Sequence, residues 1–242
     1  MGKPRISRKI GLFKADRRAA LGIAILALAL AVWRFMAENP QHNPWAPLDL
    51  RDPVGWATAS KLSSLRDDPA LCRAALTRSE IAFEALPPSG EGACARSDRT
   101  LLTAYPFAGR QPATTCAVGA GLDLWMESSV RPAAEEVLGS KIVSVQHYGA
   151  YSCRRLYGRD DGPWSEHATG NAIDISGFVL ADGRQISLLA DWDGDADRSA
   201  FLKRIRDGAC DIFGTVLSPD YNEQHRDHFH LDQAARSWST CR

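Results

Sequence analysis

The sequence lacks three features that would each have indicated a class of protein. It has no internal repeat, so nothing indicates a repeat architecture. It has no C-x-x-C pair of the kind that structural zinc sites use. It has no excess of charge, because 29 Lys and Arg balance 29 Asp and Glu. With 242 residues, 45% of them hydrophobic and 24% charged, the chain has the composition of a globular protein with one sizeable core.

The balanced total conceals an uneven distribution of charge. Residues 1–36 contain eight Lys and Arg and a single Asp, a net charge of +7, so the rest of the chain carries −7. Phosphate binding needs a basic face, and this body is mildly acidic. The sequence therefore argues against a nucleic-acid partner.

An uncharged hydrophobic run follows the basic N-terminus. Residues 19–33 carry no charge, and the run continues to residue 37 past Arg34, whose long side chain can reach the membrane interface. The flanking charges predict a transmembrane signal anchor over 19–37, with segment 1–18 in the cytoplasm and everything after Ala37 outside. A cleavable signal peptide would look similar, but bulky residues follow the A-x-A motif at 29–31. We expect an uncleaved single-pass anchor in the inner membrane.

All six cysteines lie beyond the hydrophobic run, at Cys72, Cys94, Cys116, Cys153, Cys210 and Cys241. In an oxidising compartment, an even number of cysteines predicts three disulfides. The sequence does not choose among the fifteen possible connectivities. We expect Cys72 and Cys94 to form a local pair, and Cys153 to be part of a disulfide rather than a nucleophile.

Two regions follow the anchor. Residues 38–66 are rich in proline without hydrophobic periodicity, which predicts an extended periplasmic linker; Trp45 and Trp56 lie either at the lipid interface or against the domain. Residues 67–242 are expected to form an α+β domain, a small and mostly antiparallel sheet with flanking helices. The predicted helices cover 69–76, 123–138 and 198–213, and the predicted strands 81–83, 141–148, 172–179, 186–189 and 227–231.

Two short stretches hold histidines and a carboxylate in spacings that can bind a metal. On a strand, His228 and His230 would share one face and Phe229 would point to the other. His167 precedes Asp174, which would lie on a strand between two isoleucines, where an unpaired carboxylate is costly. A lone H-x-H motif more often marks surface histidines, but an H-x6-D motif together with an H-x-H motif in one domain favours a metal site. Two His and one Asp would hold zinc and leave one position open, as in catalytic sites.

These residues carry a resemblance to known families. Ser165-x-His167-x-x-Gly170-x-Ala172-x-Asp174, followed by His228-x-His230, resembles the signature of zinc D-Ala-D-Ala carboxypeptidases and their lysostaphin- and hedgehog-like relatives. More closely, residues 71–232, about two thirds of the chain, resemble the bacterial extensin-like C-terminal domain family. The matching pieces are 151–154, 165–168, 171–175, 209–213, 215–219, Asn222, His225 and 227–232.

Carried over residue by residue, the resemblance implies that His167, Asp174 and His230 hold one zinc ion in a hedgehog- or D-Ala-D-Ala-peptidase-like fold. Arg154 matches the arginine upstream of the H-x6-D motif in the peptidases. A guanidinium there could hold a substrate carboxylate or the oxyanion of the intermediate. A surface arginine beside Arg155 is the other interpretation.

The general base is left open. Many zinc dipeptidases of this group carry a glutamate three residues before the last histidine ligand, where this sequence has Asp227. On a regular strand Asp227 would face away from His230, so we expect His228 to act as base or transition-state partner. Asp227 or Glu223 would then lie behind it. His225 either orients a ligand or caps a loop.

The resemblance and the anchor together predict a membrane-anchored periplasmic zinc hydrolase that cleaves peptide bonds in peptidoglycan stem peptides or crosslinks. Its expected partners are peptidoglycan and the inner membrane. The alternative is a zinc-stabilised wall-binding or scaffolding module without turnover; Arg154 and His228 together favour the enzyme. The acidic run from Asp191 to Asp197 suggests calcium, but an EF-hand requires Gly and Glu at two positions where this run has neither. We expect it to be a solvated loop.

Overall fold

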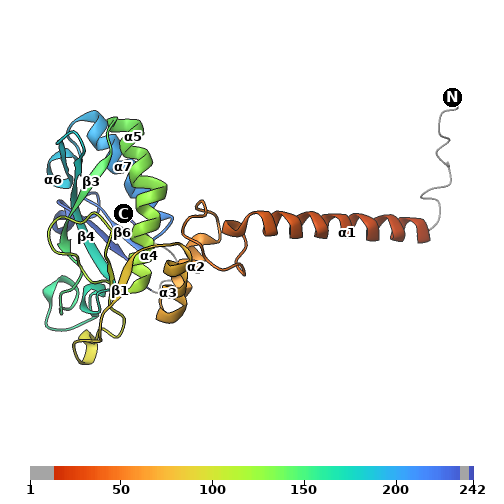
Figure 1. The fold of residues 1–242 in the computed structure, drawn as a ribbon, viewed down its shortest axis with the longest axis horizontal. Coiled ribbons are helices and arrows are strands. Elements are labelled where there is room, and N and C mark those ends of the chain that lie inside the picture. The colour runs from red at the N-terminus through yellow and green to blue at the C-terminus, as the bar shows by residue number, and fades with distance from the viewer. Residues whose placement is uncertain (1–13, 235–239) are drawn as a thin grey trace.

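The computed structural model describes residues 14–234 and 240–242, so most of the expected basic segment 1–18 lies outside the described residues. A single helix, α1 (Lys14–Glu38), projects away from the rest of the chain (Figure 1). It is long and apolar enough over Asp16–Glu38 to cross a membrane, and its large hydrophobic side chains are exposed rather than packed on the domain. The expected apolar segment 19–37 therefore lies within one continuous helix.

The segment after α1 is part of the folded core. It contains the helix α2 (Thr58–Ser64), and Leu48, Leu50 and Leu62 are all buried in the main hydrophobic cluster. The extended linker expected over 38–66 is therefore wrong from Leu48 onward. Prolines interrupt the hydrophobic periodicity of this segment, which concealed the leucines that it buries.

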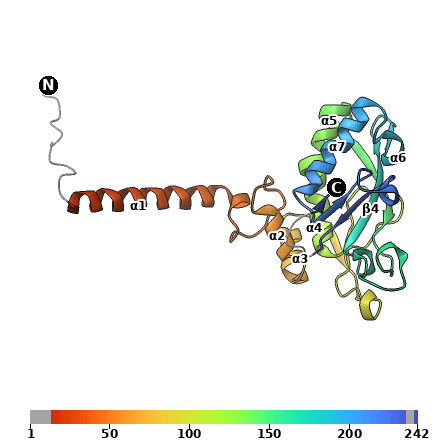
Figure 2. The same cartoon turned by 180° about the vertical axis from the view of Figure 1, so that it is seen from behind.

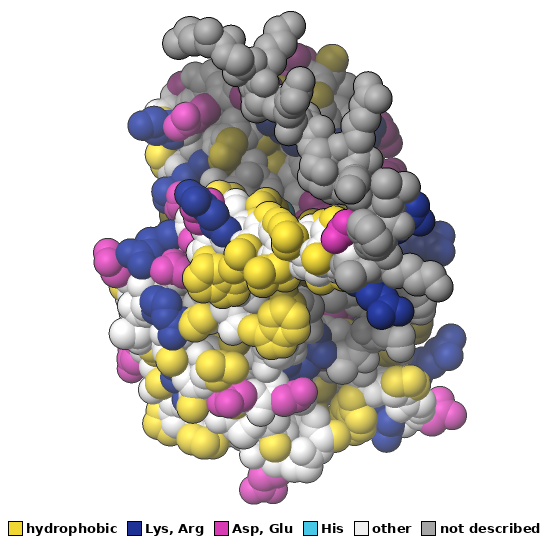
Figure 3. Space-filling model, turned by 90° about the vertical axis from the view of Figure 1, so that its right-hand side faces the viewer, with side chains coloured by type: hydrophobic (Ala, Val, Ile, Leu, Met, Phe, Trp, Pro, Cys, Tyr) yellow, Lys and Arg dark blue, Asp and Glu magenta, His cyan; other side chains and the backbone are white. Residues whose placement is uncertain are grey.

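Trp45 lies between α1 and this packed segment, and Trp56 lies within the segment, just before α2. Their exposed fractions are 86% and 62%, so neither packs into the core. Figure 3 views the molecule from its N-terminal side, where hydrophobic side chains gather in the middle and charged side chains surround them. The two tryptophans therefore belong to the exposed surface next to the apolar helix.

Helices form a layer against the sheet (Figure 2). Asp68 caps α3 (Pro69–Arg78) by accepting a hydrogen bond of 2.9 Å from the Leu71 amide, with Pro69 in the first turn. The helix expected over 69–76 is confirmed and extends to Arg78. A longer helix follows as α4 (Cys116–Trp125), a π-helical turn (Met126–Val130) and α5 (Arg131–Leu138), and α7 (Ala196–Cys210) packs beside α5. The expected helix 123–138 thus begins earlier, at Cys116.

The reason for that early start lies in the burial of α4. Nine of its ten residues are buried, so its sequence has no polar face that would reveal helical periodicity. Pro132 lies in the first turn of α5, where the missing amide proton is tolerated. Gly139 ends the helix at a φ of 65°, as expected for a left-handed cap.

One mostly antiparallel sheet carries the candidate site. Its strand order is β3 (Ile142–Gly149), β4 (Ala172–Leu180), β7 (Phe229–Asp232), β6 (Thr215–Leu217) and β8 (Thr240–Cys241), with β5 (Gln185–Ser187) paired to β4. Among the described strands only β6 and β8 run parallel. The expected strands at 141–148 and 172–179 are confirmed, that at 227–231 begins at Phe229, and that at 186–189 gives way to α6 (Leu188–Asp191).

The two faces of the sheet differ. Trp125 of α4 packs edge-on against Phe178 and Phe229, and its indole donates a hydrogen bond of 2.8 Å to the Ile205 carbonyl. Side chains alternate along a strand, so the neighbours of these aromatic residues point to the opposite face. That opposite face holds the candidate site.

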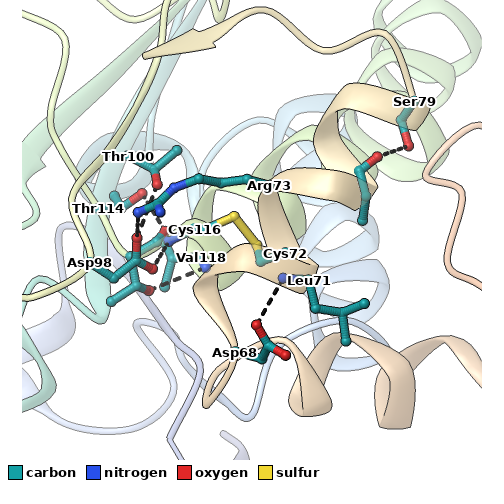
Figure 4. Close-up of a disulfide and its surroundings, with 12 residues drawn as sticks. Asp68, Leu71, Cys72, Arg73, Ser79, Asp98, Thr100, Thr114, Cys116 and Val118 are labelled. Carbon is teal, nitrogen blue, oxygen red and sulfur yellow. Dashed lines mark hydrogen bonds and ion pairs between the residues drawn. A yellow bond between two sulfur atoms is a disulfide. The ribbon is translucent and has the colours of Figure 1, made fainter. Parts of the chain in front are cut away.

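A smaller sheet and three disulfides complete the domain. β1 (Phe83–Ala85) pairs with β2 (Thr100–Leu102), two residues later than the expected strand at 81–83. The disulfides are Cys72–Cys116, Cys94–Cys153 and Cys210–Cys241, so three disulfides are confirmed and the expected Cys72–Cys94 pair is wrong. In Figure 4, Cys72 of α3 meets Cys116 at the start of α4, next to Asp98. Packing of α3 on α4 therefore selects the partner of Cys72, rather than proximity in sequence.

The acidic run from Asp191 to Asp197 has structural roles. Asp191 is buried and pairs with Arg198 at 3.2 Å. Asp195 caps α7 by accepting hydrogen bonds from the amides of Asp197 and Arg198. Asp193, Asp195 and Asp197 are exposed, so the expectation of a solvated loop is confirmed for these three residues and is wrong at Asp191.

Candidate metal centre

Two strands and one tight turn bring the predicted ligands together. Asp174 on β4 lies directly opposite His230 on β7 in the antiparallel register. His167 comes from a 3-10 turn (Glu166–Ala168) just before β4. Gly170 adopts a φ of 74° between them, which returns the chain into the strand so that His167 and Asp174 face one point.

The three ligand atoms form an equilateral triangle. His167 Nε2, His230 Nδ1 and Asp174 Oδ1 lie 3.1 Å from one another in each of the three pairs. Ligands at about 2.0–2.1 Å from a tetrahedral zinc ion are separated by about 3.3 Å. The triangle therefore has the size of one face of a zinc coordination tetrahedron, and within residues 14–234 and 240–242 no fourth His, Cys, Asp or Glu joins the cluster.

The hydrogen bonds of the two imidazoles direct lone pairs into this triangle. His167 Nδ1 lies 3.2 Å from the Ala150 carbonyl oxygen, and His230 Nε2 lies 3.0 Å from Asp232 Oδ2. Both outer partners are acceptors, so each outer nitrogen carries a proton and, in the neutral ring, the inner nitrogen has a free lone pair. Three acceptors then meet at 3.1 Å with no proton among them. A cation satisfies all three, so the residues fit a divalent metal.

The same crowding governs protonation in the metal-free protein. Burial raises the pKa of Asp174, but hydrogen bonds from His167 and His230 outweigh it and hold that pKa well below its usual range. Burial lowers the pKa of His230, but hydrogen bonds to Asp174 and Asp232 prevail and raise it to about 9. At neutral pH a proton on His230 therefore occupies the place that a metal would take.

His228 lies beside the triangle, just before β7 begins. Its Nε2 atom is 3.6 Å from Asp174 Oδ1, and its Nδ1 atom donates a hydrogen bond of 2.8 Å to Asp227 Oδ1. Tyr148 donates to the other oxygen of Asp227 at 3.2 Å. Of the two acids expected behind His228, Asp227 occupies that position. Glu223 pairs with Arg226 instead. This geometry orients the Nε2 atom of His228 toward the metal position.

A cavity of about 140 Å³ opens over the triangle and contains the remaining predicted residues. Arg154 lines it together with His225 and Tyr157. His225 Nδ1 contacts Asn222 Oδ1 at 2.7 Å, which holds the loop before β7. Burial, and then the charges of the neighbouring histidines, lower the pKa of His225 to about 4. His225 therefore stays neutral near pH 7 and combines a loop contact with a place in the cavity.

Sequence reasoning missed three contributors to the site. Asp232 supports His230, Tyr148 holds Asp227, and Tyr157 lines the cavity with a φ of 59°. Asp232 follows His230 by two residues on one strand, so the period of a strand would have identified it. Nothing in the local sequence reveals Tyr148, because it reaches Asp227 from 79 residues away.

Of the three comparisons with known proteins, one gives a match. The model of the family described as extensin-like protein C-terminus matches residues 70–242. No curated protein and no solved structure gives a significant match. The match spans well over half of the chain and includes all three residues of the ligand triangle. The chain belongs to the extensin-like protein C-terminus family.

Proposed function

We propose that this protein is a zinc-dependent hydrolase, held in the inner membrane by α1, that cleaves peptide bonds in peptidoglycan stem peptides or crosslinks. The observation that carries the proposal is the triangle of His167, Asp174 and His230, whose lone pairs meet at 3.1 Å next to an open cavity. A structural zinc site uses four protein ligands, whereas three ligands and an open position are typical of catalytic zinc. The metal-peptidase-like fold that the sequence motif implies is part of this proposal.

The residues around the triangle have distinct roles in the proposed reaction. Zinc, when bound, would polarise a carbonyl and acidify a water molecule. His228 accepts a proton at Nε2, and Asp227 keeps the opposite nitrogen protonated and the ring oriented. Arg154 holds a substrate carboxylate or stabilises negative charge on the attacked carbonyl from the cavity wall.

The proposed location rests on charge and on disulfides. Seven more positive than negative charges within residues 1–36 favour a cytoplasmic N-terminus, and three disulfides favour an oxidising compartment for the domain. The exposed Trp45 and Trp56 next to α1 fit the aromatic belt of a membrane interface. In a cell with a peptidoglycan wall, these features support a location of the cavity on the side of the wall.

The experiment incubates the full chain in detergent, loaded with zinc, with purified peptidoglycan and identifies released fragments by mass spectrometry. The full chain is used because residues from Leu48 onward are part of the core. We expect release by the wild type and by His42→Ala, which alters a histidine outside the site, and none by His230→Ala. Arg154→Gln should bind zinc normally and lose about 10²-fold in turnover.

The same measurements distinguish the hydrolase from the alternative, a wall-binding module without turnover. A chain that binds zinc stoichiometrically and retains peptidoglycan but releases no fragment would be a wall-binding module, and the hydrolase proposal would be wrong. Loss of release in His42→Ala to the same extent as in His230→Ala would also contradict it.

A further inference from the structure

A second cavity, here called the arginine pocket, lies beside the metal centre at the end of β3. It measures about 500 Å³, and its polar lining includes Arg96, Arg99 and Arg110. Its wall also contains Ala150, whose carbonyl oxygen faces the His167 ring on the other side at 3.2 Å. No Asp or Glu is among the described residues that line the arginine pocket. The three arginines therefore line one cavity whose described wall contains no carboxylate.

The positive charge of the arginine pocket is not compensated within the described part of the chain. Arg96 donates to the Ala113 carbonyl, and Arg99 donates to the Pro87 carbonyl at 2.6 Å. Within residues 14–234 and 240–242, none of the three arginines forms an ion pair with a carboxylate. A carbonyl oxygen carries no net charge, so these contacts leave the guanidinium charges in place.

Arg96 shows that this charge belongs to a built site rather than to an open surface. Only 8% of Arg96 is exposed, its Nε atom is buried without a hydrogen-bond partner, and its guanidinium lies 4.6 Å above the Tyr151 ring. Burial and the neighbouring Arg99 lower the pKa of Arg96. Burying a cation without a counter-charge is costly unless an anion offsets it.

We propose that the arginine pocket binds an organic anion, a molecule that carries a carboxylate or a phosphate on an apolar body. Guanidinium groups bind both anions through paired N–H donors. Leu86, Leu101 and Pro112 supply apolar surface beside the arginines, and the cavity has the size of a small-molecule site. This proposal does not depend on hydrolysis at the metal centre.

The test titrates the full chain in detergent, by calorimetry, with three probes. Acetyl-Ala-Glu-Ala amide offers a carboxylate, phenyl phosphate offers a phosphate, and acetyl-Ala-Gln-Ala amide is the uncharged control. Arg110→Gln removes an exposed guanidinium at the mouth of the arginine pocket, whereas Arg204→Gln removes one on α7, where it pairs with Glu136. Arg154→Gln removes the guanidinium of the metal cavity.

We expect saturable binding of at least one anionic probe, at least tenfold weaker in Arg110→Gln and changed less than twofold in Arg204→Gln and Arg154→Gln. Whichever probe binds identifies the anion as carboxylate or phosphate. Absence of binding by both anions, or equal binding in Arg110→Gln and wild type, would overturn the proposal. If only Arg154→Gln weakened binding of the anionic probe, the anion would be bound in the metal cavity, and this result would also overturn the proposal. Peptidoglycan release is measured separately, so failure of one proposal does not imply failure of the other.

Discussion

Replacing Asp232 by Asn tests whether the metal centre depends on the carboxylate behind His230. Asp232 is only 2% exposed, and its Oδ2 atom accepts the hydrogen bond from His230 Nε2 at 3.0 Å. Loss of such a partner behind a ligating imidazole costs about 10- to 100-fold in metal affinity, or about 1.4–2.8 kcal/mol. We expect the whole loss where His230 carries no competing proton, which is above its pKa of about 9.

The pH dependence of zinc affinity gives a second signature of the same contact. The pKa of His230 is raised to about 9, so at pH 7 zinc must displace a proton, and wild-type affinity should rise about 50-fold from pH 7 to pH 9. In Asp232→Asn one of the two carboxylates that hold this proton is gone. The pKa of His230 then moves toward its ordinary value, and the rise should shrink to about tenfold.

Zinc affinity is measured by competition with a chelator at pH 7, 8 and 9. Asp227→Asn is the matched control, because Asp227 contacts His228 rather than a ligand and its loss should change affinity less than threefold. Thermal unfolding without metal verifies that both variants fold. Equal affinities and equal pH slopes in Asp232→Asn and wild type would refute the assignment of His230 as a ligand supported by Asp232.

Three further predictions concern stability, each measured as the free energy of unfolding of the full chain in detergent. Asp123→Asn should stabilise the protein by about 1–2 kcal/mol at pH 7 but not at pH 4. Burial raises the pKa of Asp123 to about 6, so the wild-type protein loses stability as the pH rises toward that value and the carboxyl group ionises. An equal effect at both pH values would contradict this prediction. Leu62→Ala should destabilise by about 2–5 kcal/mol, and a change below about 0.5 kcal/mol would mean that this segment is no part of the core. Gly170→Ala should destabilise the protein by more than about 1 kcal/mol, because the φ of Gly170 is 74° and a Cβ there would lie 2.8 Å from Arg96. Gly183→Ala is the control: its φ is 87° but nothing lies near its Cβ position, so it measures the cost of the backbone conformation without the steric clash.

Strand geometry is local, so the faces on which Asp174 and His230 lie were predictable, whereas the set of three ligands was implied by the family resemblance. Asp174 and His230 each lie on a strand, and alternation alone places them on the face opposite Ile173 and Phe229. The sequence could not specify which strands are neighbours. The pairing of β4 with β7 joins residues 56 apart, and that pairing brings Asp174 within 3.1 Å of His230.

The errors share one physical cause, since each concerns contacts between segments that are distant in sequence. Cys72 bonds Cys116 because α3 packs on α4, although Cys94 is nearer along the chain. Leu48 and Leu62 enter the core from a proline-rich segment in which no periodic pattern marks them. The burial of α4 on almost all sides likewise removes the amphipathic signal that would have revealed its start.

The candidate site contains residues on strands and residues on a segment that is anchored by a disulfide. Hydrogen-bonded strands fix two of the ligands, whereas Arg154 and Tyr157 lie on the segment between β3 and β4. Cys153, the residue before Arg154, is bonded to Cys94, so a disulfide anchors that segment at the point where it carries the guanidinium. An arginine on a loop no longer positions a substrate precisely if its backbone moves by about 1 Å. In the proposed oxidising compartment, the Cys94–Cys153 disulfide would therefore also hold Arg154 in place beside the proposed metal position.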